Sequence, residues 1–217
     1  MKRHRNINQR LEHVRIPADQ VRLDGTLDLP PDSPGVVVFA HGSGSSRFSP
    51  RNRFVASELS AHGIGTFLID LLTPEEDTLY KTRFDIEMLA TRLGSVVDWL
   101  TARLGPEAAS IGLFGASTGA AAALKTAASA GQNIRAVVSR GGRPDLAGEY
   151  LHLVRCPTLL IVGGNDPEVL RLNERAFAQL TCEKQLEVVH GASHLFEEPG
   201  ALEEVARLAS NWFQRYL

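Results

Sequence analysis

The sequence predicts a doubly wound α/β fold, in which a mainly parallel sheet is covered by helices on both faces. Short apolar segments of strand length alternate along the chain with longer segments whose apolar residues recur every three or four positions. The first pattern is typical of strands buried on both faces, and the second is typical of amphipathic helices. Their alternation over 217 residues favours a single α/β domain spanning residues 1–217.

The strands are predicted from two kinds of apolar pattern. Val21, Leu23, Leu27 and Leu29 alternate with polar residues, which predicts an antiparallel strand at the edge of the sheet. Continuous apolar segments predict the remaining strands, at residues 36–40, 66–69, 110–114, 136–138, 158–162 and 186–189. Because such segments have no polar face, these strands should form the buried, parallel part of the sheet.

Helices are predicted where start and stop signals frame an apolar stripe. One helix should begin with Ser49 as its N-cap and Pro50 in the first turn. A second should span residues 82–104 and end at Gly105. The last should cover residues 202–216, with its apolar residues on one face against the sheet.

The charge balance argues against a nucleic-acid partner. Lys and Arg number 23 and Asp and Glu 25, giving a net charge of −2, whereas a nucleic-acid-binding domain normally has a basic excess. One basic cluster, residues 2–5, is not followed by an apolar segment. It is therefore interpreted as part of a flexible tail, residues 1–10, and not as a signal peptide.

Membrane and disulfide signals are weak as well. The longest apolar run, residues 36–40, is far too short to span a bilayer, so no membrane partner is expected. Cys156 and Cys182 are too few for a disulfide scaffold and suit a reducing, cytoplasmic location. Cys156 directly precedes Pro157 and a buried strand, which favours a core position over a reactive thiol.

Residues 115–119 read GASTG and lie between a predicted strand and an alanine-rich helix. A G-x-S-x-G sequence in this position is typical of a sharp strand-to-helix turn that lifts a serine hydroxyl into a cleft. The pattern predicts Ser117 as a nucleophile. A serine that only caps the helix is the alternative interpretation.

A serine nucleophile needs a base, and the base needs a carboxylate that fixes its tautomer. Asp166 follows the apolar segment 158–162, and His194 follows the segment 186–189. The order Ser117, Asp166, His194 is the one used by α/β hydrolases. These three residues are the predicted catalytic triad.

Two alternatives to this assignment remain open. Asp166 precedes Pro167 and could serve only as a helix N-cap, in which case Asp145 is the next candidate acid. His190 is the other candidate base, but it lies at a predicted strand end, whereas His194 lies in the loop. Asp70 precedes the nucleophile in sequence and is expected to order a loop.

Taken together, residues 41–46 (HGSGSS), 115–119 (GASTG), 163–167 (GGNDP) and 191–194 (GASH) resemble the motifs of α/β hydrolases of the dienelactone-hydrolase-like group. The resemblance covers nearly the whole chain and implies an α/β-hydrolase fold. The small size of the chain predicts that no large lid domain is present. The enzymes that give the group its name use a cysteine nucleophile, whereas this chain has Ser117. That departure favours a more general carboxylic ester hydrolase.

The resemblance also implies where the oxyanion hole lies. Acyl transfer places negative charge on the former carbonyl oxygen, and two main-chain amides normally stabilise it. The expected donors are the amides of Thr118 and Ser43, with Gly44 as the reserve for Ser43. His41 is expected to brace this loop.

Substrate recognition is the least constrained feature of the sequence. Residues 70–85 have no strong apolar pattern and are predicted to form a loop at one side of the cleft. Arg140 and Arg143, and with them Arg83, could meet an anionic substrate group, because guanidinium pairs well with carboxylate. The alternative is that these arginines brace loops or face water.

The sequence therefore predicts a serine hydrolase that cleaves a small-molecule carboxylic ester through an acyl-enzyme. No metal and no cofactor are expected, since neither H-E-x-x-H nor a cysteine pair at zinc spacing is present. A thioesterase, a dienelactone or lactone hydrolase, and a non-catalytic binding protein with the same fold are the alternatives. The sequence leaves the oligomeric state open.

Overall fold

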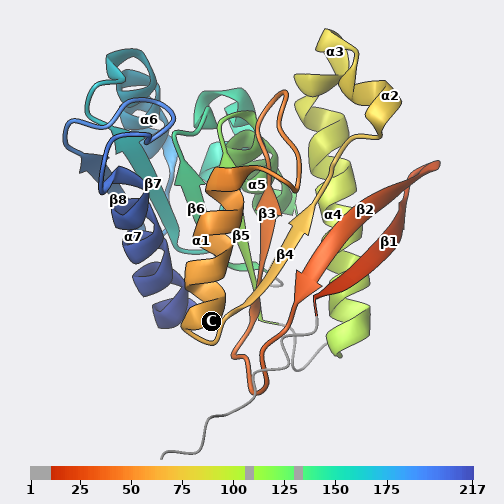
Figure 1. Ribbon diagram of the computed structural model, residues 1–217. Coiled ribbons are helices and arrows are strands. Elements are labelled where there is room, and N and C mark those ends of the chain that lie inside the picture. Colours follow the sequence, from red (N-terminus) through yellow and green to blue (C-terminus); the bar gives the residue numbers. More distant parts are fainter. Residues whose placement is uncertain (1–10, 106–109, 130–133) are drawn as a thin grey trace, which may run out of the picture.

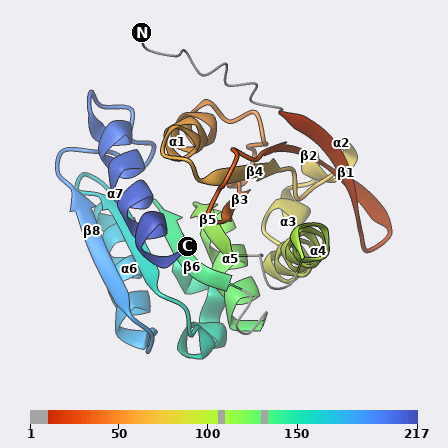
Figure 2. The same cartoon turned by 90° about the horizontal axis from the view of Figure 1, so that it is seen from below.

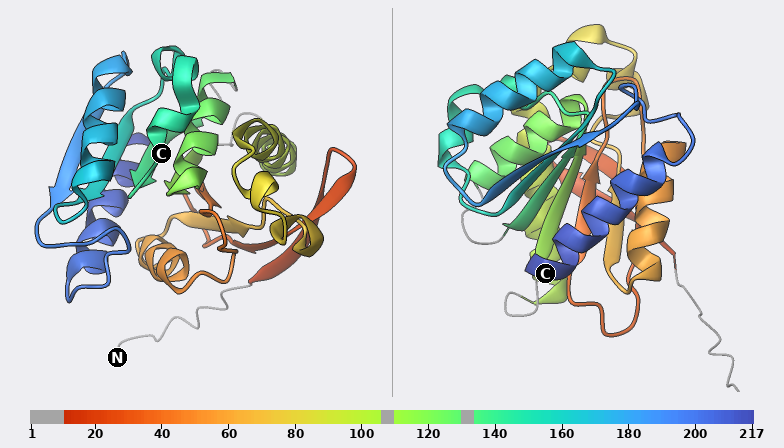
Figure 3. Two further views of the ribbon diagram at one scale, coloured as in Figure 1. Left: turned by 90° about the horizontal axis from the view of Figure 1, so that it is seen from above. Right: turned by 90° about the vertical axis from the view of Figure 1, so that its left-hand side faces the viewer.

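A computed structural model describes residues 11–105, 110–129 and 134–217 (Figure 1). The predicted flexible tail, residues 1–10, lies outside the described residues. The chain forms a central sheet with helices packed on both faces, as the sequence predicts (Figures 2 and 3).

Within the described residues the sheet has eight strands in the order β1-β2-β4-β3-β5-β6-β7-β8. The strand β2 pairs antiparallel with β1 and β4, and the other neighbours are parallel. The strands are β1 (Glu12–Ala18), β2 (Val21–Asp28), β3 (Val36–Ala40), β4 (Gly65–Ile69), β5 (Ile111–Ala116), β6 (Ile134–Arg140), β7 (Thr158–Gly163) and β8 (Lys184–Val189). All the parallel strands therefore end at the same edge of the sheet, where ligands of such folds bind.

The helices divide between the two faces. On one face lie α4 (Ile86–Leu104), α5 (Thr118–Ser129), the 3-10 helix η2 (Pro144–Leu153) and α6 (Pro167–Gln179). On the other lie α1 (Pro50–Ala61) and α7 (Ala201–Tyr216). Two apolar cores result, one on each face. No helix among the described ranges is long and apolar enough to cross a membrane.

Most predicted elements are confirmed, including the helix that begins after the Ser49 N-cap. Two details at the sheet edges are wrong. The antiparallel strand β2 is not the edge, because β1 pairs outside it. Pro17 in β1 weakens the strand pattern, but an edge strand tolerates proline. At the other edge, β8 is parallel as predicted but only partly buried, because it is the last strand of the sheet and one of its edges has no neighbouring strand among the described residues.

The prediction that residues 70–85 form a loop without helices is also wrong. It contains two single-turn helices, α2 (Pro74–Asp77) and α3 (Tyr80–Arg83), and we call residues 70–85 the α2–α3 segment. Thr73 and Glu76 form a capping box, which explains a helical start without an apolar stripe. Arg92 binds both carboxylate oxygens of Glu76 at 2.6 Å and holds the pKa of Glu76 below its ordinary value. The segment is too small to be a lid domain.

Candidate active site

Ser117 stands at the turn between β5 and α5 with φ +50°, a left-handed conformation that non-glycine residues rarely adopt. Three main-chain hydrogen bonds hold it there. Its N–H donates to the Arg140 carbonyl at 3.2 Å, and its carbonyl accepts from the amides of Ala120 at 3.1 Å and Arg143 at 3.0 Å. A strained residue fixed by its surroundings in this way is typical of a catalytic turn.

The flanking glycines are needed for steric reasons. A Cβ on Gly115 would lie 2.4 Å from the Cα of Ala120, and a Cβ on Gly119 would lie 2.2 Å from the carbonyl oxygen of Ala40. Both distances are shorter than real side chains allow. The two glycines therefore let β3, β5 and α5 approach closely enough to form the turn.

Asp166 and His194 are brought together from different loops. The Nδ1 atom of His194 lies 2.7 Å from Oδ2 of Asp166. The other carboxylate oxygen, Oδ1, accepts a hydrogen bond from the amide of Val169 at 3.4 Å, so Asp166 is also the N-cap of α6. The N-cap role of Asp166 and its contact with His194 therefore coexist, one on each oxygen. With Nδ1 donating to Asp166, Nε2 is the ring atom left to accept a proton.

The His194 turn lies against the turn that follows β6, which is hydrogen-bonded to Ser117. Gly141 directly follows Arg140, whose carbonyl accepts the Ser117 amide. A Cβ on Gly141 would lie 3.1 Å from the main-chain oxygen of His194 and 3.6 Å from its Cε1 atom. The 3.6 Å distance is an ordinary contact, whereas the 3.1 Å distance is tight, and Gly141 has φ +50°, so both the main-chain oxygen of His194 and the backbone conformation favour glycine here.

The alternative acid and base residues have other surroundings. Both carboxylate oxygens of Asp145 are bound by Arg143, at 2.9 and 2.8 Å. Asp70 pairs with Arg47, whose main-chain amide also donates to it, so it orders a loop as expected. His190 is exposed in the turn after β8.

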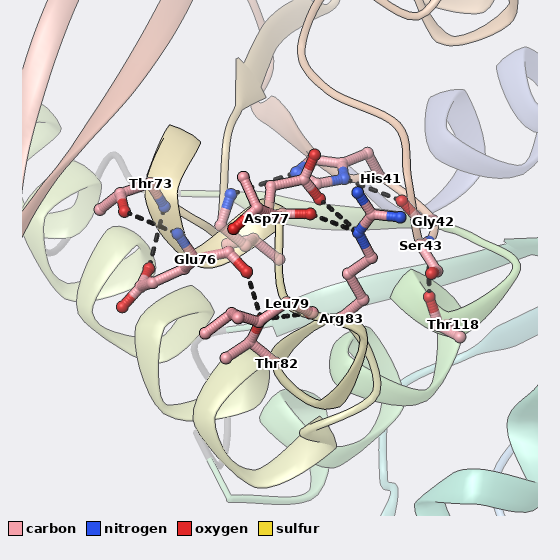
Figure 4. Close-up of polar contacts among 12 residues, drawn as sticks. His41, Gly42, Ser43, Thr73, Glu76, Asp77, Leu79, Thr82, Arg83 and Thr118 are labelled. Atoms are coloured by element: carbon pink, nitrogen blue, oxygen red, sulfur yellow. Dashed lines mark hydrogen bonds and ion pairs between the residues drawn. The ribbon is translucent and has the colours of Figure 1, made fainter.

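The loop after β3 meets the Ser117 turn through Thr118 (Figure 4). The Ser43 amide donates to the Thr118 hydroxyl at 2.9 Å, so this predicted oxyanion donor already has a partner. His41 braces the same loop, because its Nδ1 lies 3.0 Å from the Gly42 carbonyl and its Nε2 accepts from the Leu71 amide at 3.2 Å. With both ring nitrogens bound, His41 is a structural residue of the loop.

The three arginines differ in what holds them. Arg143 is tied to Asp145, and this contact raises the pKa of Arg143. The Nε atom of Arg83 binds the carbonyl and the carboxylate of Asp77 (Figure 4). Its Nη1 atom would lie 3.5 Å from a Cβ on Gly44. Arg140 is buried, and its Nε and Nη1 atoms have no partner within the described part of the chain.

The cysteines are remote from this chemistry. Burial raises the pKa of Cys156 to about 12, so its thiol stays protonated, in agreement with the predicted core position. Among the described residues, no group of three or more His, Cys, Asp or Glu side chains is placed to hold a metal ion.

Sequence reasoning missed three contributors to this site: the Thr118 hydroxyl, Gly141 and Arg47, the partner of Asp70. Gly141 had a visible signal, since it opens a glycine pair directly after a strand. The Thr118 contact joins residues 75 positions apart and has no local signal.

The mostly parallel sheet with a strained serine turn after β5 and an acid and a histidine after β7 and β8 defines an α/β hydrolase fold. The chain belongs to the dienelactone hydrolase family, whose model matches residues 23–217. The family resemblance inferred from the sequence motifs is thereby confirmed.

Similar proteins agree on the fold. The chain is 52% identical to a dienelactone hydrolase from Anabaena variabilis of known crystal structure, with a TM-score of 0.91, covering 96% of this chain and 99% of that one. An α/β serine hydrolase without lid from Xanthomonas campestris is 21% identical with a TM-score of 0.76 and 94% coverage of both chains, which supports the fold alone.

A longer relative has a different name. The chain is 56% identical over 206 residues to a Mycobacterium tuberculosis protein called "putative phosphoribosyl transferase". The match covers 95% of this chain but 46% of that protein. The chain therefore spans about half the length of the curated relatives it matches, and the transferase name describes a protein of about twice this length.

Proposed function

We propose that this hydrolase cleaves carboxylic esters through an acyl-enzyme, with Ser117 as nucleophile, His194 as base and Asp166 as its orienting acid. The observation that carries the proposal is the 2.7 Å contact between His194 and Asp166, at the same carboxyl edge of the sheet that holds Ser117 at φ +50°. The membership of the dienelactone hydrolase family supports hydrolysis as the reaction class.

In this mechanism the Ser117 hydroxyl attacks the ester carbonyl carbon while Nε2 of His194 takes its proton. The Asp166 carboxylate holds the ring in the required tautomer and stabilises the imidazolium. When the tetrahedral intermediate collapses, His194 returns the proton to the departing alcohol. A water molecule, deprotonated by His194, then attacks the acyl-enzyme and releases the acid and free Ser117.

The oxyanion is assigned to the amides of Thr118 and Ser43. The Thr118 amide belongs to the first turn of α5, where the helix dipole also favours negative charge. The Ser43 amide faces the Thr118 hydroxyl in this structure, and a substrate oxyanion would compete with that hydroxyl for it. The Thr118 side chain thus keeps the donor of a separate loop close to the nucleophile.

The test combines covalent labelling with a substrate panel. A fluorophosphonate should add once to the wild-type chain. Ser117→Ala should abolish labelling and lower kcat by about 10⁵-fold or more, without unfolding the protein. Labelling of Ser117→Ala at the wild-type rate would place the nucleophile elsewhere.

The panel should contain matched short aryl esters, thioesters and lactones. Preferred cleavage of aryl esters supports the proposal. Preferred cleavage of thioesters or lactones would contradict the proposed ester substrate and make the preferred compound class the substrate instead. A folded chain that neither reacts with fluorophosphonate nor turns over any ester would favour the non-catalytic binding protein.

A further inference from the structure

Arg140 is a buried cation whose charge is not neutralised by the side chains around it. The residue is 7% exposed, and neither Nε nor Nη1 has a hydrogen-bond partner in residues 11–105, 110–129 or 134–217. Burial, together with the charge of Arg51, lowers the pKa of Arg140 to about 10, so the guanidinium remains charged at neutral pH. A buried charge without a counter-charge is strongly unfavourable, which indicates that an anion belongs here.

Arg140 is the last residue of β6 and is a main-chain hydrogen-bond partner of Ser117. Its carbonyl accepts the Ser117 amide at 3.2 Å, and the next residue, Gly141, lies against His194. Its guanidinium carbon lies 5.9 Å from the ring centroid of Phe196, two positions after His194. Because Phe196 belongs to the core under α1 and α7, the Arg140 side chain extends to that face of the sheet.

The surroundings of Arg140 add positive potential on the same side. Arg51 is the second residue of α1, a helix of 12 residues, and its charge acts on Arg140. Nη1 of Arg51 donates a hydrogen bond to Oε1 of Glu197 at 3.0 Å. Nε of Arg51 is buried and has no hydrogen-bond partner among the described residues. The amino-terminal end of α1 contributes a further positive partial charge.

We propose that Arg140, Arg51 and the start of α1 form a binding site for an oxyanion, a carboxylate or a phosphate, next to Ser117. The preferred occupant is an anionic group of the substrate, which deepens the proposed function and rests on it. A free anion such as phosphate is the other source of the same chemistry. Arg143 does not share this role, since Asp145 already satisfies it.

The first arm of the test measures substrate charge. The probes are p-nitrophenyl hemisuccinate, which carries a free carboxylate, and its methyl ester, which is neutral. Arg140→Met should raise KM for the charged ester about tenfold to a hundredfold, the usual range for a lost charged hydrogen bond, and change KM for the neutral ester less than twofold. Arg140→Lys should keep part of the preference, and Arg207→Met, an exposed arginine paired with Glu204, should leave both values unchanged.

The second arm measures free anions. Thermal unfolding of the wild-type chain is followed in phosphate and in chloride at equal ionic strength, with Arg140→Met and Arg51→Met beside it. Phosphate should stabilise the wild type and not Arg140→Met. Without phosphate, Arg140→Met should be at least as stable as the wild type, because an apolar chain replaces an unneutralised buried charge.

The outcomes separate the two sources. Loss of the preference for the charged ester assigns the site to a substrate group, and a phosphate effect without such a preference assigns it to a free anion. An unchanged preference together with an equal phosphate response in wild type and Arg140→Met overturns the proposal. Fluorophosphonate labelling of wild type and Arg140→Met is the control, because failure to label the wild type would count against the esterase and leave the phosphate arm intact.

Discussion

The carboxyl edge of strands β5 to β8 and the α2–α3 segment beside it are stabilised in different ways. At the strand edge, the residues of the candidate site are fixed by main-chain hydrogen bonds and steric contact, as for Ser117 and Gly119. The α2–α3 segment has no buried residue in either helix and depends on a capping box and on ion pairs such as Arg92 with Glu76. The comparison teaches that the sheet itself fixes the candidate catalytic residues, whereas α2 and α3 beside them can change without disturbing the core. Leu71 and Leu72, which precede these two helices, are buried in that core.

Among the variants that test this comparison, the largest effect is expected at Asp166, which belongs to the strand edge. Asp166→Asn should lower kcat by about ten thousandfold, because asparagine does not hold the required tautomer of His194. Stability should be nearly unchanged, since asparagine is as good an N-cap as aspartate. The measurement is ester turnover with thermal unfolding on the same samples.

Asp166→Ala is the matched variant, because it removes the cap as well and should lower the free energy of unfolding by about 1 kcal/mol. Near-normal turnover in Asp166→Asn would reduce Asp166 to a cap. Asp145→Asn would then be the variant to test as the acid.

A smaller effect is expected where the two loops meet at Thr118. Thr118→Val removes the hydroxyl that holds the Ser43 amide, so kcat should fall roughly tenfold, less than the hundredfold or more that follows loss of a whole oxyanion donor. KM should change little, because the contact acts on the transition state. Thr118→Ser should restore most of kcat. A rise in kcat with valine would instead mean that the hydroxyl mainly competes with the substrate oxygen.

The smallest effect on activity is expected in the α2–α3 segment. Glu76→Gln breaks the ion pair with Arg92 and should lower the free energy of unfolding at pH 7 by about 1 to 2 kcal/mol, with kcat/KM within twofold of wild type. The pKa of Glu76 is lowered in the folded state, so its contribution is present above its ordinary value of 4.5 and is lost as pH falls through the lowered value.

Denaturant unfolding of wild type and Glu76→Gln between pH 7 and pH 3 measures this difference. It should shrink once the pH drops below 4.5. A difference independent of pH would show that the carboxylate charge is not what stabilises the segment. A large loss of activity would mean that the segment shapes the catalytic residues after all.

The same contrast explains how far the sequence alone leads. Local sequence patterns predict the strands and the Ser117 turn, and they place Asp166 and His194 in the loops after two of these strands. The strand β1 is harder to predict because Pro17 interrupts its pattern, and α2 depends on a single capping box. The contact between Ser43 and Thr118 and the burial of Arg140 depend on how separate loops and layers meet, and no short segment contains that information.

The double use of the Asp166 carboxylate has an evolutionary consequence. One oxygen holds His194 and the other begins α6, so a replacement of Asp166 by most residues changes reactivity and helix stability together. Substitutions that change substrate specificity are therefore expected at positions other than Asp166. Variation that retunes specificity is expected to accumulate among the exposed residues 78–81, which lie outside the capping box and the ion pairs of the α2–α3 segment.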